Sequence, residues 1–361
     1  ACSFSPNAAQ PGDDDDDGSG SGSGSGSDMG SGSGSGSDMG SGSGSSTCFG
    51  DAPVIVCPKT LPTNDYSGGT TLFDTDTACM ELSPANDAVC VIGGKTAKFT
   101  GTFIAFGSRP LVVLSLTTID VGGELSVSST SVRRGAGSDP ANAGCTGTDP
   151  TADGGGGYGG SFGSVGGNGP GATDGAAGPI ITPTTLRGGC PGGAGKPASI
   201  AQLGHGGGAV ALIACTSISV LGSVDAAGEG GGGGAATNGG YGGGAGGMIV
   251  FNTPTLTVDT TTHIYANGGG GGGGGASMVA FGGTGKTAVD ETDGGAFGGG
   301  GGGTGGDGGK GDSVLGGHDL LDGRAGTGGG ANGGGGGGMG VITVLHATLT
   351  LADKAHFSPT P

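Results

Sequence analysis

The sequence predicts an all-β protein: a short parallel β-solenoid (β-helix) with long glycine-rich insertions packed as a polyglycine-II-like bundle. Three observations predict this fold. Short segments rich in Val, Ile and Thr recur as a weak repeat, three long insertions interrupt the repeat at one common point, and the insertions contain nearly pure glycine tracts. A single repeat could not bury its apolar face, whereas stacked repeats form a continuous core.

The repeat is clearest at 247–268, GMIVFNTPTLTVDTTTHIYANG, which holds three short apolar segments. The alternation within these segments turns every second side chain inward, as in strands. Further copies occur at 111–129, 209–228 and 341–358, with a poorer copy at 91–107. Aligning the copies gives two apolar columns, Ile119, Ile218, Leu256 and Leu349 in one and Val121, Val220, Val258 and Leu351 in the next. We therefore expect each copy to form one turn of the solenoid.

Composition excludes several classes of protein. Glycine supplies 100 of the 361 residues, aromatic residues supply 4%, and the chain has no tryptophan. Such a chain has little ordinary core-building capacity, and its folding must also overcome the large backbone entropy of glycine. An ordinary α/β enzyme is therefore disfavoured. The formal net charge of −18 argues against nucleic acid as a partner and against binding to anionic membrane surfaces.

Residues 1–47 are predicted to form a disordered acidic and Ser/Gly tether. An acidic run at 13–17 is followed by almost pure Ser/Gly, including two copies of SGSGSGSDMG, and such a stretch behaves as a flexible coil. The opening Ala1-Cys2-Ser3 looks like the end of a bacterial lipoprotein signal, in which case Cys2 carries a lipid and anchors the protein to a membrane. The alternative for Cys2 is an ordinary cysteine near a terminus. The alternative for the Ser/Gly stretch is an engineered linker.

The remaining cysteines predict a disulfide-stapled head. Residues 48–90 are expected to form a cap, because the end of a solenoid exposes apolar surface and unpaired strand edges, and residues 91–361 form the solenoid itself. Cys215 lies on a strand column and is expected to be a buried free thiol. Disulfides imply export to an oxidising compartment, and the chain has no C-x-x-C motif that would support a zinc or redox site. The candidate pairs are local, although the sequence leaves the connectivity open: Cys48–Cys57, Cys79–Cys90 and Cys145–Cys190.

The glycine-rich insertions span 130–207, 229–246 and 268–340, and each returns just before the first strand of the next copy. A solenoid corner can host such excursions. Disorder is the alternative, since glycine and serine tracts usually form flexible coils. Ordered polyglycine-II helices are favoured, because the tracts lack the serine padding of the tether and share a point of departure. Such helices have three residues per turn and bond laterally to their neighbours.

No motif indicates a cofactor, a metal or catalysis. AFGGTGKT at 280–287 satisfies a relaxed P-loop pattern, but a glycine tract precedes it where a buried strand is needed. Asp120, Glu124 and Asp225 could line a groove, as paired acids do in glycoside-cleaving β-helices. Solvated edges of the solenoid turns are the simpler interpretation of these three carboxylates.

Other polar and aromatic residues have structural interpretations. His263 and His356 fall at corresponding repeat positions, which suits a surface ladder better than a metal pair without a third ligand. Arg133, Arg134 and Arg187 flank the first insertion and are expected to bond loop carbonyls or nearby carboxylates, with an anionic glycan as the alternative. Five aromatic residues interrupt the tracts and are expected to plug or flank the glycine bundle rather than to bind sugars: Tyr158, Phe162, Tyr241, Phe281 and Phe297.

Several segments carry a family resemblance. CFG…C, DTDTACMELSPANDAVCVI, RRGAG, LRGGCPG and GGMIV…PTLTV…ANGGGG resemble the glycine-rich exported proteins and lipoproteins of myxobacterial type, often labelled PE-PGRS-like. The resemblance runs from Cys48 to about Leu351 and implies export without implying an activity. The glycine tracts are also similar in composition to polyglycine-II modules of a springtail antifreeze protein and of phage tail-tip adhesins.

We therefore expect an exported structural or adhesive protein, tethered to the cell surface or outer membrane, that displays a rigid glycine-rich head and is not an enzyme. Its partner would be a surface ligand or another copy of itself. The alternatives are a ligand-binding module for glycan or ice, a subunit of an extracellular fibre, and a carbohydrate-active β-helix enzyme. The lack of a convergent acid/base cluster disfavours the last of these.

Overall fold

The computed structural model describes residues 47–79, 88–141, 144–197, 203–277, 282–286, 298–302, 306, 323, 325–351 and 356–361. These residues contain seventeen strands and no helix. The strands form three sheets, and every strand pair within them is parallel. The described part of the chain is therefore an all-β parallel solenoid, as the sequence predicts.

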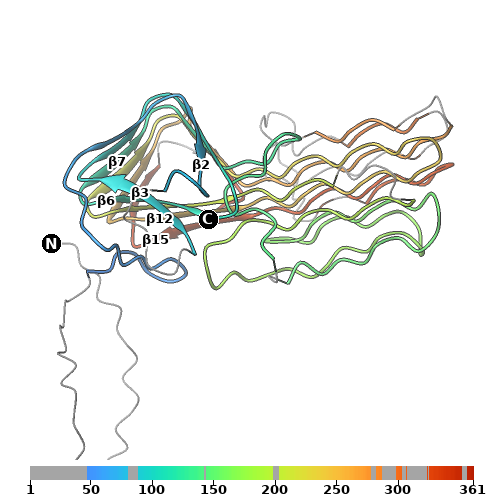
Figure 1. Ribbon diagram of the computed structural model, residues 1–361, viewed down its shortest axis with the longest axis horizontal. Helices are drawn as coiled ribbons and strands as arrows, with labels where there is room; N and C mark the ends of the chain where they lie inside the picture. The colour runs from blue at the N-terminus through green and yellow to red at the C-terminus, as the bar shows by residue number, and fades with distance from the viewer. Residues whose placement is uncertain are drawn as a thin grey trace, which may run out of the picture.

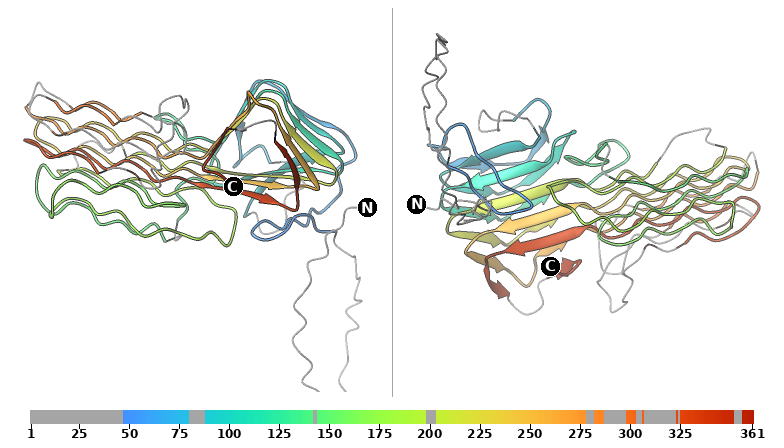
Figure 2. Two further views of the ribbon diagram at one scale, coloured as in Figure 1. Left: turned by 180° about the vertical axis from the view of Figure 1, so that it is seen from behind. Right: turned by 90° about the horizontal axis from the view of Figure 1, so that it is seen from below.

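Successive strands fall in turn on three sheets, so each coil of the chain adds one strand to each sheet. Sheet I contains β3 (Cys90–Gly94), β6 (Leu111–Ser115), β9 (Ala209–Ala214), β12 (Met248–Asn252) and β15 (Val341–Leu345). Sheet II contains β1 (Tyr66–Gly68), β4 (Ala97–Phe99), β7 (Thr118–Val121), β10 (Ser217–Val220), β13 (Thr255–Val258) and β16 (Thr348–Leu351). Sheet III contains β2 (Thr71–Asp74), β5 (Thr102–Phe106), β8 (Glu124–Ser126), β11 (Ser223–Asp225), β14 (His263–Tyr265) and β17 (His356–Ser358). Together the sheets enclose a triangular prism (Figure 2).

The apolar columns predicted from the repeat are confirmed on sheet II. Ile119 pairs with Ile218, Ile218 pairs with Leu256, and Leu256 pairs with Leu349. The next column, which starts at Val121, keeps the same register. Ile119, Ile218 and Leu256 are fully buried in the core of the prism. In-register parallel stacking thus lets a repeat too short to fold alone bury its apolar side chains against its neighbours.

Sheet I is buried on both of its faces. Its strands are continuous apolar runs, such as AVALIA in β9, and every residue of β6, β9 and β12 is buried. The inner side chains join the core of the prism, while the outer ones pack beneath a segment that contributes Phe49, Val54 and Val56. The side-chain amide of Asn252 on β12 donates a hydrogen bond of 3.1 Å to Asp51 of this segment.

The sequence predicted that residues 48–90 form a single cap. In the structure they divide into two parts. Strands β1 and β2 form the first coil and lie at the edges of sheets II and III. Residues 48–57 instead lie across the outer face of sheet I. The physical reason is the outer apolar row of that sheet, which would otherwise be a large patch exposed to water.

All three insertions arise at one corner of the prism. They leave after β8, β11 and β14 on sheet III and return at β9, β12 and β15 on sheet I, which is the shared point of departure predicted from the sequence. Their described parts run side by side away from the prism (Figure 1). Sheet II is the side of the prism opposite this corner (Figure 2).

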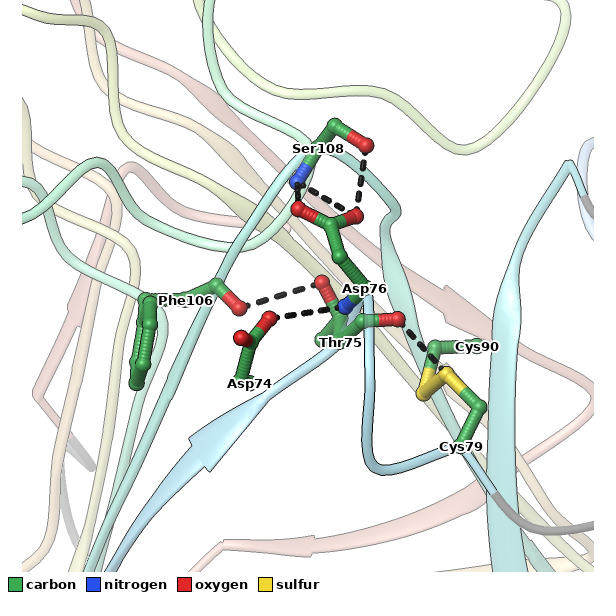
Figure 3. Close-up of a disulfide and its surroundings, with 7 residues drawn as sticks. All are labelled: Asp74, Thr75, Asp76, Cys79, Cys90, Phe106 and Ser108. Carbon is green, nitrogen blue, oxygen red and sulfur yellow. Dashed lines mark hydrogen bonds between the residues drawn. A yellow bond between two sulfur atoms is a disulfide. The ribbon is translucent and has the colours of Figure 1, made fainter.

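The three predicted disulfides, Cys48–Cys57, Cys79–Cys90 and Cys145–Cys190, are confirmed. Figure 3 shows the second of them, which joins the turn after β2 to the first residue of β3. In the same turn, Asp76 accepts hydrogen bonds from the backbone N–H of Ser108 at 2.9 Å and from its hydroxyl at 2.6 Å. The first coil is thus held to the chain that follows it both covalently and by charge-assisted hydrogen bonds.

Cys215 overturns one prediction. It is disulfide-bonded rather than a free thiol, and its partner lies outside the described residues. The residue follows the end of β9 and is half-buried against the outer apolar cluster of sheet I. Ala214 before it faces the core of the prism, so Cys215 faces the outer side of the sheet and not the closed core that the column suggested.

We expect Leu256→Ala to destabilise the protein by about 2–5 kcal/mol, because this fully buried side chain fills the column between Ile218 and Leu349 and its truncation leaves a cavity. The matched control is Thr257→Ala, an exposed position on the same strand, which should change stability by less than about 0.5 kcal/mol. Urea unfolding measures both changes. Equal losses of stability in the two variants would contradict the assignment of Leu256 to the inner face of β13 and of Thr257 to its outer face.

Candidate functional site

The backbone of the second insertion makes hydrogen bonds in a strict rotation of three. Each residue of 238–246 donates its N–H to one of three neighbouring segments in turn. One set of donors, Gly240, Gly243 and Gly246, bonds the carbonyls of Asn332, Gly335 and Gly338 at 2.9, 3.0 and 2.9 Å. A second set, Gly239, Gly242 and Ala245, bonds Lys196, Gly193 and Cys190 at 3.1, 2.9 and 2.9 Å. The third set, Asn238, Tyr241 and Gly244, bonds Ala235, Gly232 and Glu229 at 2.8, 2.9 and 2.9 Å.

The outgoing arms change from a twofold to a threefold period just beyond the prism. Where the chain leaves β11 and β14, the N–H groups of Ala226 and Gly228, two residues apart, bond the carbonyls of Tyr265 and Asn267. This is the spacing of a parallel strand pair. Farther out, donors lie three residues apart: Gly231 bonds Gly270 and Gly234 bonds Gly273, both at 2.8 Å. The same two segments therefore remain neighbours while their backbone repeat changes.

At many glycine positions these arms have no room for a side chain. A Cβ atom added at Gly242 would lie 1.6 Å from the carbonyl oxygen of Tyr158, and one at Gly240 would lie 2.0 Å from that of Gly272. Real Cβ atoms do not approach carbonyl oxygens so closely, so only glycine fits at such positions. The glycine purity of the insertions follows from the close lateral approach of their backbones.

Three of the five predicted plugging aromatics are described, and all three are enclosed. Tyr241 and Phe162 are buried, and the ring of Tyr158 lies against Gly193 and Gly147. Burial raises the pKa of Tyr158, and the charge of Asp149 raises it further. These rings fill space beside the arms and are not presented as a flat platform for sugars. The other two, Phe281 and Phe297, lie outside the described residues.

A polar cluster joins the first and second insertions at their base. Asp139 accepts hydrogen bonds from His205, with Nδ1 to Oδ2 at 2.6 Å, and from the backbone N–H of Gly206 at 2.8 Å. Glu229 accepts the backbone N–H of His205 at 3.3 Å, and burial raises the pKa of its carboxyl. Arg134 lies 3.9 Å from Asp139. His205, Glu229 and Arg134 line a cavity of about 380 Å³, and the contacts clamp the two insertions together.

The three acids considered as a glycosidase-like group are divided between two sheets. Asp120 is exposed on the outer face of sheet II, where it pairs in register with Lys98. Glu124 and Asp225 lie on neighbouring strands of sheet III. Asp225 is buried, so the expectation that all three carboxylates are solvated is wrong for this residue. Burial raises the pKa of Asp225 to about 7, although hydrogen bonds from Ser128 and from the backbone N–H of Ala227 act to lower it. The arrangement holds one buried carboxyl at the point where the second insertion leaves the prism.

The histidine pair and the P-loop-like segment are each described only in part. His263 and His356 are register partners on β14 and β17, as predicted, and Tyr265 OH is hydrogen-bonded to Nδ1 of His263. The side chain of His356 is outside the described residues. Among the side chains that are described, no group of three or more His, Cys, Asp or Glu is arranged to hold a metal ion. The P-loop-like segment 280–287 is described only at 282–286.

Arg187 and Arg134 at the first insertion contact a loop carbonyl and a carboxylate, as predicted, whereas Arg133 contacts an aromatic ring. Arg187 is buried, donates from Nε to the carbonyl of Gly188 at 3.1 Å, and lies 5.0 Å above the ring of Phe162. Burial lowers its pKa from the usual value. Arg133 lies 6.0 Å from the ring centre of Phe106. Together with the contact of Arg134 to Asp139, these positions indicate that the arginines hold the base of the insertion.

Comparison with known protein families, with curated proteins and with solved structures finds no match to this chain.

No helix in the described part of the chain is long and apolar enough to cross a membrane.

Sequence reasoning missed the polar cluster at the base of the insertions. Asp139 and His205 are 66 residues apart in the chain, and no spacing rule links them. The available signal was their position, because Asp139, His205 and Glu229 each lie within a few residues of a glycine tract that starts or ends an insertion. Charged residues at such boundaries are candidates for contacts between arms.

Asp225→Asn should flatten the pH dependence of stability. The pKa of Asp225 is raised from 3.8 to about 7, so between these values the folded state holds a proton that the unfolded state has released. The contribution of this carboxyl to stability is thus complete below about pH 4 and is lost as the pH rises through about 7. The amide cannot ionise, so the variant should gain stability relative to the natural protein as the pH rises across that window.

Urea unfolding at a series of pH values measures this difference. Asp120→Asn is the control for the removal of one negative charge, since Asp120 is exposed on sheet II. If the difference between the Asp225 variant and the natural protein stays constant with pH, the buried carboxyl is not the source of the dependence.

Proposed function

We propose that this protein is an exported, surface-tethered structural or adhesive protein that displays a rigid head built from its glycine-rich insertions. The observation that carries the proposal is the rotation of backbone hydrogen bonds along 238–246 among three neighbouring segments. A flexible glycine coil would leave these N–H groups to water. A chain whose every amide has a fixed protein partner is suited to holding a shape.

The proposed arrangement of the insertions is a polyglycine-II-like bundle. Such a helix has three residues per turn and no internal hydrogen bonds, so successive N–H groups point in three directions. The threefold rotation and the exclusion of Cβ atoms at Gly240 and Gly242 both support this arrangement. One helix alone would gain nothing to offset about 1–2 kcal/mol of backbone entropy per residue. The arms therefore depend on one another for order.

The geometry suits display more than catalysis. The arms extend away from the prism from a single corner, and a clamp of Asp139, His205 and Glu229 holds their base (Figure 1). Of the acids considered for a glycoside-cleaving β-helix, Asp120 lies on sheet II, apart from Glu124 and Asp225 on sheet III, and Asp225 is buried beside the exit of an insertion. A stiff projection supports a structural or adhesive role.

Export and attachment complete the proposal. Three disulfides indicate a protein that folds outside the reducing cytosol. We propose that residues 1–47 form a tether, in keeping with the resemblance to exported glycine-rich proteins. Cys2 is the one cysteine of the eight left as a partner for the disulfide-bonded Cys215, so the lipid at Cys2 that the sequence suggested is not part of the proposal. The head would be held away from its surface by a flexible Ser/Gly coil.

Gly242→Ala tests the bundle. Its Cβ would lie 1.6 Å from the carbonyl oxygen of Tyr158, so the arms must separate locally and stability should fall by about 1–3 kcal/mol or more. Hydrogen exchange should show protected amides at 238–246 in the natural protein and faster exchange there in the variant. Gly328→Ala is the control, because its nearest neighbour, Asn332 Oδ1, is 3.7 Å away. Exchange at 238–246 as fast as in an unfolded peptide would overturn the rigid head.

A non-reducing peptide map of the exported protein tests how Cys2 is used. Because Cys2 is the one remaining partner for Cys215, the N-terminal peptide should be cross-linked to the peptide that contains Cys215. A thiol that carries a lipid cannot also form a disulfide. An N-terminal peptide that carries the added mass of a lipid at Cys2 would therefore contradict this pairing.

A further inference from the structure

The outer face of sheet II carries a regular array of hydroxyl groups. Register places Ser217, Thr255 and Thr348 in one row across β10, β13 and β16, and Ser219, Thr257 and Thr350 in the next row. The first row continues through Thr118 on β7. The residue between each pair, such as Ile218 or Leu256, points into the core. The sequence signal is Ser/Thr-x-Ser/Thr at the middle strand of successive repeats.

The array is exposed or half-buried, and the described residues leave its hydroxyls free of hydrogen bonds. Thr257, Thr348 and Thr350 are exposed, and the other three are half-buried. Within the described part of the chain, none of the six side chains takes part in a hydrogen bond. The glycine arms leave from the opposite corner of the prism, and residues 48–57 cover sheet I, so neither covers this face (Figure 1; Figure 2).

Charge and shape limit what could bind there. The six positions are neutral in a chain whose net charge is −18. The nearest charges on the same rows, Lys98 and Asp120, are adjacent register partners of opposite sign at one end of the array. These six positions carry no charge although the protein as a whole is strongly acidic. Such a face suits a partner that is itself uncharged. None of the six positions is aromatic, so the face lacks the rings on which sugars usually stack.

We propose that this face binds ice. Hydroxyls on a parallel sheet repeat about every 4.8 Å across the strands and about every 6.6 Å along them. These two distances are close to repeats of the oxygen atoms on a prism plane of ice. Each threonine presents a hydroxyl that anchors a water and a methyl group that orders the waters around it. A rigid array of this kind adds many weak contacts to one crystal without distorting it.

Partition into slowly grown ice tests the proposal with the full-length protein. The natural protein should be incorporated into the ice and should slow its recrystallisation. Ser219→Tyr and Thr257→Tyr place a large ring within the array and should abolish both effects. Ser223→Tyr is the matched control, since Ser223 lies four residues later on the same coil, on the outer face of sheet III, and should leave both effects intact.

Circular dichroism and the midpoint of thermal unfolding establish that each variant is folded. Thr257→Ser removes only a methyl group, so this milder change should weaken partition into ice without abolishing it. Exclusion of the natural protein from ice would overturn the proposal. So would equal partition of the sheet II and sheet III variants, or binding to microcrystalline cellulose or chitin in place of ice. The proposal goes beyond the structural role and fails independently of it, because hydrogen exchange in the glycine arms reports on that role alone.

Discussion

The lateral hydrogen bond between backbones that carry no side chains is the interaction on which the arms of this molecule depend. In most folds, side-chain packing provides the main gain that offsets the entropy of an ordered chain. Here the interior positions of the arms have room for no Cβ atom, as Gly240 and Gly242 illustrate. Order must instead come from N–H groups that each find a carbonyl on a neighbouring segment. Such bonds contribute only about 1 kcal/mol each, so many must form together.

The prism has the hydrophobic core that the arms lack. Its core of Ile, Leu, Val and Phe side chains fixes the order and spacing of the strands, and each arm begins as the continuation of a strand already paired with its neighbours. The entropy of bringing the arms together is therefore met by ordinary hydrophobic burial in the solenoid. The polar clamp of Asp139, His205 and Glu229 adds a second tie at the base.

The sequence predicted the parts of the fold that depend on local patterns. The alternation in the repeat placed Ile119, Ile218 and Leu256 in one column, and pairing each cysteine with the next one along the head gave the correct disulfides. It failed where the outcome depends on distant neighbours. Nothing local shows that 48–57 crosses sheet I, although the two-sided apolar run AVALIA was a signal that this face needs a cover. Cys215 was misjudged because it lies on the outer side of sheet I and not in the core.

The change from a twofold to a threefold backbone repeat constrains how the insertions can vary in length. Beyond Gly228 and Asn267, equivalent donors recur only every third residue. Adding one or two glycines to an arm would turn its amides away from the segments that receive them, whereas adding three restores every direction. An arm such as 238–246 also bonds three different segments, so its extension is useful only if those segments lengthen with it. Related chains should therefore differ in these tracts by multiples of three, with matched changes in neighbouring arms.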